Sequence, residues 1–239
     1  MNYSVHLLGS EEIAKDTMAF RFEKPAEYRF SAGQFCFLNL PDAGFSDERG
    51  LRRHLSIASS PLENELLFAT KMSASAFKQT LRVMRNSTAI TIEQPLGHLA
   101  LSKSTALPSI FLAGGIGITP FRSMIRYAAE AGTGHTITLF YSNRTPEEAA
   151  FLGELEGIAE AHGSIRVLPT MTRMQESSVK WTGLTGRIDA AMIETHCRDW
   201  RDSVFYTAGP PAMVDSMRET LDEMHIGKDR MHIEKFSGY

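Results

Sequence analysis

An apolar strand that runs into a glycine turn and then into a helix constrains this chain more than any other feature. The stretch Ser109 to Ala113 is nearly all apolar, and Gly114-Gly115-Ile116-Gly117 follows it at once. Pro120 suits the first turn of a helix, because no hydrogen bond from its nitrogen is needed there. Glycines let a backbone approach an anion closely, and the unpaired N–H groups of a helix start carry partial positive charge. The layout predicts a phosphate-binding turn in an α/β sheet.

The hydrophobic pattern up to about residue 103 is that of short strands. They are bounded by turn residues, and a helical period is nearly absent, which predicts an N-terminal antiparallel β-barrel of six strands. One short helix is expected at Ala76 to Met84. The expected strands are Tyr3 to Leu8, Thr17 to Phe22, Gln34 to Leu40, Leu55 to Ala58, Leu66 to Thr70 and Ala89 to Glu93.

From about residue 108, strands alternate with helical segments. This alternation predicts a parallel α/β sheet of five strands with helices on both faces. We therefore expect two domains, residues 1–103 and residues 104–239. The expected strands of the second are Ser109 to Ala113, Thr136 to Tyr141, Ile165 to Thr170, Val204 to Ala208 and His232 to Glu234.

Two helices of the second domain have clear start signals. One is expected to begin at Thr145 as its cap, with Pro146 in the first position and Glu148 in the third. Its buried residues would be Phe151, Leu155 and Ile158. Another is expected to open near Pro211 and to bury Met213, Val214, Met217, Leu221 and Met224.

Composition narrows the classes of function. Lys and Arg total 25 against 28 acids, a net charge of −3, which argues against nucleic acid or a membrane surface as a general partner. No apolar run approaches the ~20 residues of a membrane span and the N-terminus lacks a signal pattern, so we expect a cytoplasmic protein. Cys36 and Cys197 are the only cysteines, too few for a four-cysteine iron–sulfur cluster, and we assign no metal site.

A second glycine turn strengthens the prediction of a nucleotide site. Gly209-Pro210-Pro211 follows the strand Val204 to Ala208 directly, as the first turn follows its own strand. Ligands of parallel α/β sheets bind beyond the carboxyl ends of the strands. Two such turns at one sheet edge favour a dinucleotide site over two purely structural turns.

Six motifs, in order along the chain, resemble those of the ferredoxin–NADP reductase superfamily and cover nearly its whole length. The resemblance implies an FAD-binding barrel, a Rossmann-like NAD(P)-binding domain and electron exchange across the cleft between them. The motifs are Arg53-His54-Leu55-Ser56-Ile57-Ala58-Ser59-Ser60-Pro61, Ser75-Ala76-Phe77-Lys78, Pro95-Leu96-Gly97, Gly114-Gly115-Ile116-Gly117-Ile118-Thr119-Pro120, Tyr206-Thr207-Ala208-Gly209-Pro210-Pro211 and His232-Ile233-Glu234-Lys235-Phe236.

The first motif implies how a flavin would be held. Arg53 matches the family arginine that pairs with a flavin phosphate, for which a planar, always charged guanidinium is suited. Ser56 matches the hydroxyl placed near flavin N5. Leu55 stands where the family has a stacking tyrosine, so a less specific hold on the flavin ring is expected. His54 is a candidate flavin contact or an outward-facing strand residue.

Two other segments are implied to contact the flavin. Ser75, Ala76 and Phe77 match a helix start whose backbone N–H groups meet the flavin pyrophosphate. Glu234 and Phe236 match a glutamate and an aromatic ring that lie beside the flavin. Tyr239, beyond them, is a second candidate ring.

The glycine turns are implied to seat the nicotinamide coenzyme. The matching residues are Gly114, Gly115, Gly117, Thr119, Pro120, Gly209 and Pro210. Ser142 and Arg144 follow the second parallel strand and offer a hydroxyl and a guanidinium where NAD-binding folds usually offer an acid. This favours NADP(H), with NAD(H) left open. Ala208 replaces the cysteine that several reductases carry near the nicotinamide, so slower transfer is expected.

The resemblance thus implies an FAD-dependent NAD(P)H oxidoreductase that moves hydride between nicotinamide C4 and flavin N5, with Ser56 and Glu234 tuning the reacting edge. Electrons would pass to a separate carrier such as a ferredoxin, a flavodoxin or an iron–sulfur subunit. Two alternatives stay open. Leu55 and Ala208 permit an electron-transfer or regulatory subunit with little activity alone, and Leu55 also permits a reductase that uses flavin as a diffusible substrate.

Overall fold

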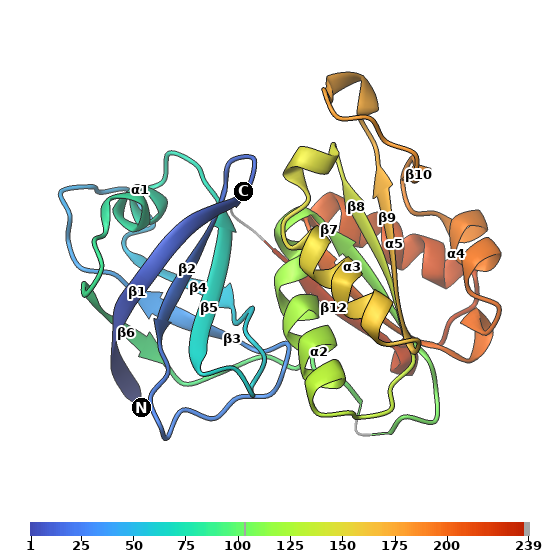
Figure 1. Ribbon diagram of the computed structural model, residues 1–239, viewed down its shortest axis with the longest axis horizontal. Helices are drawn as coiled ribbons and strands as arrows, with labels where there is room; N and C mark the ends of the chain where they lie inside the picture. Colours follow the sequence, from blue (N-terminus) through green and yellow to red (C-terminus); the bar gives the residue numbers. More distant parts are fainter. Residues whose placement is uncertain (103, 237–239) are drawn as a thin grey trace.

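The structure is a computed structural model that describes residues 1–102 and 104–236. Two sheets lie side by side, an antiparallel one in the N-terminal half of the chain and a helix-covered parallel one in the C-terminal half (Figure 1). The fold class expected from the hydrophobic pattern is confirmed. Within these residues no helix is both long and apolar enough to cross a membrane. Tyr239 lies outside the described residues, and so does Lys103, at the expected domain boundary.

The first sheet has the six antiparallel strands that were expected, in the order β4-β3-β6-β1-β2-β5. They are β1 (Asn2–Ala14), β2 (Thr17–Glu23), β3 (Phe35–Asn39), β4 (Arg52–Ser56), β5 (Glu65–Lys71) and β6 (Ala89–Glu93). β4 begins three residues earlier than predicted and ends at Ser56, because the next residues leave β3 and Ala58 N–H donates to the Leu67 carbonyl at 2.8 Å.

The long first strand bends the sheet around its core. Its first half pairs with β6, and its second half pairs with β2 after a register shift between Leu7 and Gly9. Such irregularities increase local twist and let a sheet curl. The core so enclosed is apolar and includes Val5, Leu7, Phe20, Phe22, Leu38, Ile57, Phe68 and Ile92.

Helix α1 (Ala76–Val83) completes this core, as expected for a helix at Ala76 to Met84. The Ser75 side chain caps the helix by accepting the Lys78 N–H at 3.4 Å. Phe77 and Leu81 are each 1% exposed and pack into the barrel.

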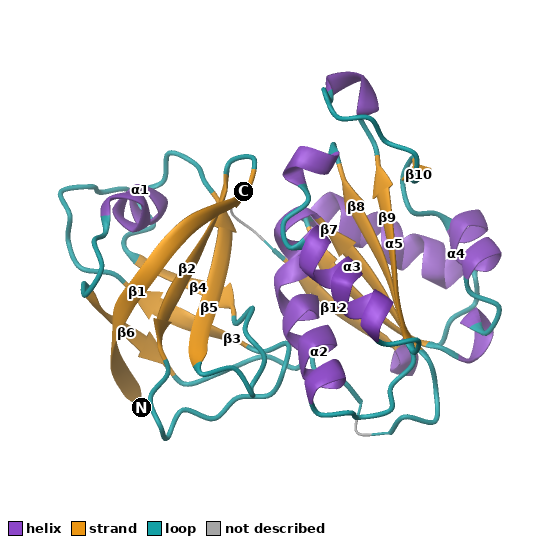
Figure 2. Cartoon of the chain, viewed as in Figure 1, coloured by secondary structure: helices purple, strands orange, loops and turns teal. Residues whose placement is uncertain are grey.

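The second sheet is parallel throughout, in the order β10-β9-β8-β7-β11-β12. Helices cover both of its faces (Figure 2), α2 and α3 over one core cluster and α4 and α5 over the other. The strands are β7 (Ser109–Gly114), β8 (Ile137–Asn143), β9 (Ile165–Met171), β10 (Leu184–Thr185), β11 (Val204–Gly209) and β12 (Met231–Lys235). The helices are α2 (Ile118–Glu130), α3 (Leu152–Ala161), α4 (Ala190–His196) and α5 (Pro211–Glu223), with short 3₁₀ turns η1 (Gly115–Gly117), η2 (Pro146–Glu148), η3 (Met174–Glu176), η4 (Trp200–Asp202) and η5 (Lys228–Arg230).

The predicted strand count and one helix of this domain need correction. The parallel sheet has six described strands where five were expected. The additional strand, β10, was missed because it is two residues long and shows no hydrophobic pattern. The helix expected from Thr145 is wrong: the 3₁₀ turn η2 ends after Glu148, and α3 starts only at Leu152. Between them Phe151 takes a left-handed backbone, with φ of 60°, which interrupts a continuous helix. The helix opening at Pro211 is confirmed as α5.

The barrel and the parallel domain pack closely along α2. Gly33 lies in the barrel loop before β3, and a Cβ atom built on it would stand 2.1 Å from the Leu99 carbonyl oxygen and 2.3 Å from Met124 Cε of α2. Its φ of +99° also lies in the left-handed region. Gly44, in the next loop, has a similar φ of +83° but no atom within 4 Å of such a Cβ.

We expect Gly33→Ala to lower the free energy of unfolding by about 3 kcal/mol, since left-handed strain of about 1–2 kcal/mol adds to overpacking of about 1–3 kcal/mol. Gly44→Ala should cost about 1 kcal/mol, because only the backbone term remains. Urea unfolding of both variants measures the difference. Equal losses would contradict the tight packing of Gly33 against α2.

Candidate functional site

A cavity between the two domains gathers residues from both. The barrel contributes β4, the end of β5 and the start of α1, while the parallel domain contributes the glycine turn and the segment after β12. The lining residues are Arg49, Arg53, His54, Leu55, Ser56, Ala69, Thr70, Ser75, Phe77, Lys78, Ile116, Thr119 and Phe236. Seven of the predicted flavin contacts, from three separate stretches of the chain, therefore border one cavity.

One part of the cavity wall carries three cations. Arg49 and Arg53 line it together with Lys78, whose side chain is buried. Burial lowers the pKa of Lys78, and the charges of Arg49 and Arg53 lower it further. Burial also lowers the pKa of His54, and the positive charges of Arg49, Arg52 and Arg53 lower it further. Since like charges held together repel, an anion bound here would be strongly favoured.

A carboxylate already touches the start of α1 beside these cations. Asp47 Oδ2 accepts the Ala76 N–H at 2.8 Å, and Asp47 Oδ1 lies 3.5 Å from Arg53 Nη2. The hydrogen bond from Ala76 is the largest cause of a lowered pKa of Asp47. The helix start predicted to meet a phosphate therefore does interact with an anionic group, supplied here by the protein.

The residues of β4 differ in how they meet the cavity. Ser56 is 6% exposed, and Leu55 is half-buried beside it. The His54 ring packs against the rings of Phe35 and Phe37, with centroids 5.3 Å and 5.6 Å away. His54 therefore borders the cavity while also joining an aromatic cluster on β3.

The end of β12 brings an aromatic ring to the first cavity, whereas the carboxyl group of Glu234, two residues earlier, lines neither this cavity nor the one beside it. Phe236 lines the cavity and its N–H donates to the Gly209 carbonyl at 2.9 Å, which ties it to the second glycine turn. Glu234 pairs with Ala208 across the β11–β12 ladder. Burial raises the pKa of Glu234 to about 7. This carboxyl group can therefore hold or release a proton near neutral pH.

A second cavity lies next to the first and follows the carboxyl edge of the parallel sheet. Its lining residues are Thr17, Lys71, Met72, Gly114, Gly115, Ile116, Ser142, Asn143, Arg144, Glu148, Ala150, Thr172, Pro210 and Met213. Lys71 of the barrel and Glu148 of η2 form an ion pair across it at 2.7 Å. The predicted coenzyme residues Gly114, Gly115, Ser142, Arg144 and Pro210 meet here.

Three of the predicted coenzyme residues line neither of these two cavities. Pro120 is buried in the first turn of α2. A Cβ atom on Gly117 would lie 2.3 Å from the Ala208 carbonyl oxygen, and one on Gly209 would lie 3.2 Å from Gly114 Cα. These two glycines let the turns after β7 and β11 pack against each other.

The structure adds residues that the sequence motifs did not single out. Arg49 and Lys78 border the first cavity; Lys78 is the last residue of the Ser75-Ala76-Phe77-Lys78 motif, which was the available signal, although no role was expected for it. Asn143 is 5% exposed and lines the second cavity, and neither atom of its side-chain amide has a partner within the described residues. Arg187 joins Ser142 in a neighbouring cavity. An unpaired buried amide calls for an external partner.

Comparison with known proteins gives a consistent result. The family described as "Oxidoreductase NAD-binding domain" matches residues 111–219. Terephthalate 1,2-dioxygenase, reductase component 2, from Comamonas sp is 26% identical over 94% of this chain and 65% of its own length. Ferredoxin–NADP reductase B from Sorangium cellulosum is 28% identical over 87% of this chain and 86% of its own length. The chain thus spans about 65% of the length of the first of these relatives.

Solved structures share the fold over the whole chain. A ferredoxin NADP⁺ reductase from Neisseria gonorrhoeae with bound FAD and NADP has a TM-score of 0.79 at 22% identity and covers 98% of both chains. The Amycolatopsis cytochrome P450 reductase GcoB has a TM-score of 0.83 at 22% identity, covering 99% of this chain and 70% of its own. These TM-scores show that both structures share the fold of this chain.

We expect the raised pKa of Glu234 to make stability fall as pH rises. Below pH 4.5 the carboxyl group is protonated in the folded and the unfolded chain, so it costs nothing. Between pH 4.5 and about 7 only the unfolded chain ionises, and the free energy of unfolding should drop by roughly 2 to 3 kcal/mol and then level off.

The Glu234→Gln variant should lack this drop, because its amide does not titrate. Urea unfolding of both proteins at pH 5 and pH 8 measures it. Parallel changes in the two proteins would refute a desolvated Glu234.

Proposed function

Because the chain belongs to the ferredoxin–NADP reductase superfamily, we propose that it is an NAD(P)H-dependent flavoprotein oxidoreductase. When bound, FAD would supply the chemistry, taking two electrons as hydride from the nicotinamide and releasing them one at a time. The observation that carries the proposal is the meeting of the two cavities at one turn. Ile116 borders both of them, so ligands in the two cavities would meet beside it.

The first cavity fits FAD. Arg49, Arg53 and Lys78 provide three positive charges, which suit the diphosphate of FAD better than the single phosphate of FMN. The start of α1, from Ser75 to Phe77, adds a helix dipole, although its Ala76 N–H already donates to Asp47. Phe77 is fixed in the barrel core, so this helix start is held in place.

The reacting edge of the flavin is assigned to Ser56 and Glu234. The Ser56 hydroxyl would orient that edge by hydrogen bonding. Glu234, with a pKa of about 7, would hold a proton near it at neutral pH. Leu55 and Phe236 would cover the ring faces and exclude water, and Phe236 would have to move aside for the nicotinamide.

The second cavity fits a nicotinamide dinucleotide. Gly114 and Gly115 would receive its pyrophosphate at the start of η1 and α2. The unpaired Asn143 amide would gain hydrogen bonds from a polar ligand there. Arg144 and the neighbouring Arg187 favour the additional phosphate of NADP(H) over NAD(H).

The acceptor in this proposal is a separate redox carrier such as a ferredoxin, a flavodoxin or an iron–sulfur subunit. Relatives named as reductase components of a dioxygenase support such a role. In this proposal the domain of residues 1–103 supplies most of the FAD site and the domain of residues 104–239 most of the coenzyme site, and each cavity also has lining residues from the other domain. A cytoplasmic setting is part of the proposal, and two free buried cysteines suit it.

One observation favours a second candidate, a reductase for diffusible flavin. Leu55 lines the first cavity at the position of the family tyrosine, and an aliphatic side chain lacks the stacking contribution of about 1 kcal/mol. Turnover that requires added flavin and saturates with it would favour this candidate over a bound prosthetic group.

The first test is an anaerobic absorbance spectrum of the purified protein, followed by titration with NADPH and then NADH. We expect a flavin band near ~450 nm that NADPH bleaches at a much lower concentration than NADH. FAD released by heating should account for the band. A protein that neither retains nor binds flavin would contradict the reductase function.

Coenzyme choice is tested by Arg144→Ala. Loss of a guanidinium that pairs with the extra phosphate should raise the KM for NADPH about 10- to 50-fold, equivalent to roughly 1.5–2.5 kcal/mol, and change the KM for NADH less than twofold. Arg218→Ala is the matched control, since Arg218 is exposed on α5 and, in the part of the chain that the structure describes, its one ion pair is with Asp215, at 3.7 Å. Equal changes for both coenzymes would contradict a phosphate contact at Arg144.

A further inference from the structure

One face of α2 joins the two domains through charged and polar side chains. Thr119, Arg122, Ser123 and Arg126 recur at helical spacing along it. The Arg122 side chain is only 6% exposed, although it is always charged. A buried guanidinium is stable only where acceptors surround it.

Arg122 has acceptors in both domains. Its Nη1 donates to the Ala58 carbonyl at 2.8 Å and to Glu63 Oε2 at 3.1 Å, and its Nη2 donates to Glu63 Oε1 at 3.3 Å. Ala58 and Glu63 belong to the barrel. Within its own domain Arg122 donates from Nε and Nη2 to Glu154 of α3, at 2.8 Å and 2.7 Å. The guanidinium therefore makes three hydrogen bonds across the domain boundary and two within the parallel domain.

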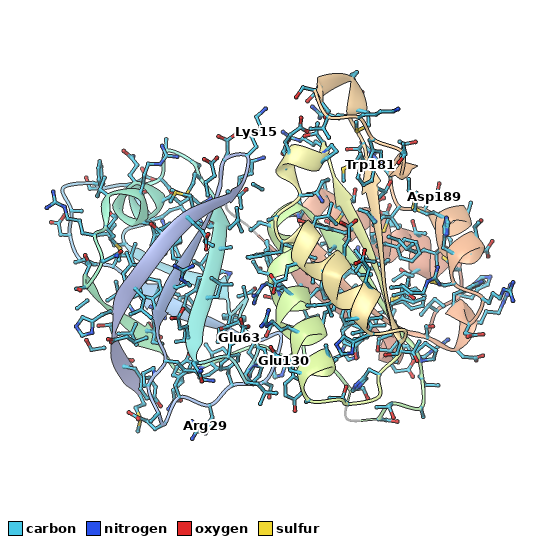
Figure 3. The ribbon with its side chains drawn as sticks, in the orientation of Figure 1. Lys15, Arg29, Glu63, Glu130, Trp181 and Asp189 are labelled. Atoms are coloured by element: carbon cyan, nitrogen blue, oxygen red, sulfur yellow. The ribbon has the colours of Figure 1, made fainter. Side chains whose placement is uncertain are left out.

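Neighbouring contacts hold the same barrel segment. Ser123 Oγ donates to the Ser59 carbonyl at 2.6 Å. Arg126 Nε lies 3.3 Å from Glu63 Oε1 and 2.8 Å from Glu130 Oε1. Figure 3 labels Glu63 on the barrel side and Glu130 on α2 where the two domains meet. Glu63 is itself fixed, because its Oε2 accepts the Ser60 N–H at 2.5 Å.

The barrel segment that accepts hydrogen bonds from Arg122, Ala58 to Glu63, follows directly on a strand that lines the first cavity. Ala58 is two residues beyond Ser56, and Thr119 precedes Arg122 by one turn of α2. Ser56 and Thr119 both line that cavity, one from each domain. The ionic contact therefore sets the separation of the two cavity walls.

We propose that Arg122 and Glu63 form an interdomain latch, and that Arg122 is a positioning residue for electron transfer between the coenzyme and the flavin. The inference rests on the proposed function. Bidentate arginine–carboxylate pairs are directional, whereas an apolar contact of the same area permits sliding. Rates of transfer fall steeply with displacement, up to about 100-fold for 1 Å.

The test compares Glu63→Gln with Glu154→Gln. Each variant removes one carboxylate from the same arginine, but only the first weakens a contact between the domains. The rate of flavin reduction at saturating NADPH should fall about 10-fold or more in Glu63→Gln and less than twofold in Glu154→Gln. The KM for NADPH and the flavin content should stay within twofold of the wild type in both, because neither residue lines the two cavities.

Calorimetry of the same proteins supplies a readout that needs no activity. Glu63→Gln should broaden or split the unfolding transition as the domains uncouple, and Glu154→Gln should leave its shape unchanged. Equal slowing in the two variants, or a wild-type rate and transition in Glu63→Gln, would overturn the latch. If NADPH reduces the flavin neither in the wild type nor in either variant, the proposed function fails. The calorimetric comparison would still decide whether the latch exists.

Discussion

The close approach of two glycine turns is the constraint on which the rest of the molecule depends. Gly117 and Gly209 bring the turns after β7 and β11 so near that a methyl group added at Gly117 would collide with the Ala208 carbonyl oxygen, 2.3 Å away. Because neither turn carries a side chain at the contact, the starts of α2 and α5 lie side by side at one edge of the sheet. Both cavities open at this edge, and Ile116 can border each of them for that reason.

The charges around the first cavity are unevenly distributed. Arg49, Arg53 and Lys78 concentrate positive charge at the barrel wall, where burial and the charges of the two arginines lower the pKa of Lys78. Glu234, at the end of β12, has no charged partner among residues 1–102 and 104–236, and its pKa is raised by burial. An anion-binding wall and a titratable carboxyl group thus belong to different domains, so their relative position depends on how the domains pack.

Helix α2 determines that packing. Phe121 and Ile125 bury one side of it in the parallel domain, while Arg122, Ser123 and Met124 meet the barrel. The same helix carries Thr119 at the cavity, so one rigid element connects the core, the domain boundary and the site. The barrel lies so close to this helix that a Cβ atom on Gly33 would stand 2.3 Å from Met124 Cε.

The sequence by itself determined the fold class, because strand and helix periods and glycine turns are local properties. It could not determine β10, because two residues are too few to show a period. Nor could it determine the break at Phe151, where the backbone is left-handed just before α3. Of the site, it predicted the stretches around Arg53, Ser75 and Gly114, but it missed Asn143. Only the tertiary structure decided that Arg49 and Lys78 share a wall and that Arg122 reaches Glu63, because these contacts join residues tens of positions apart in the chain.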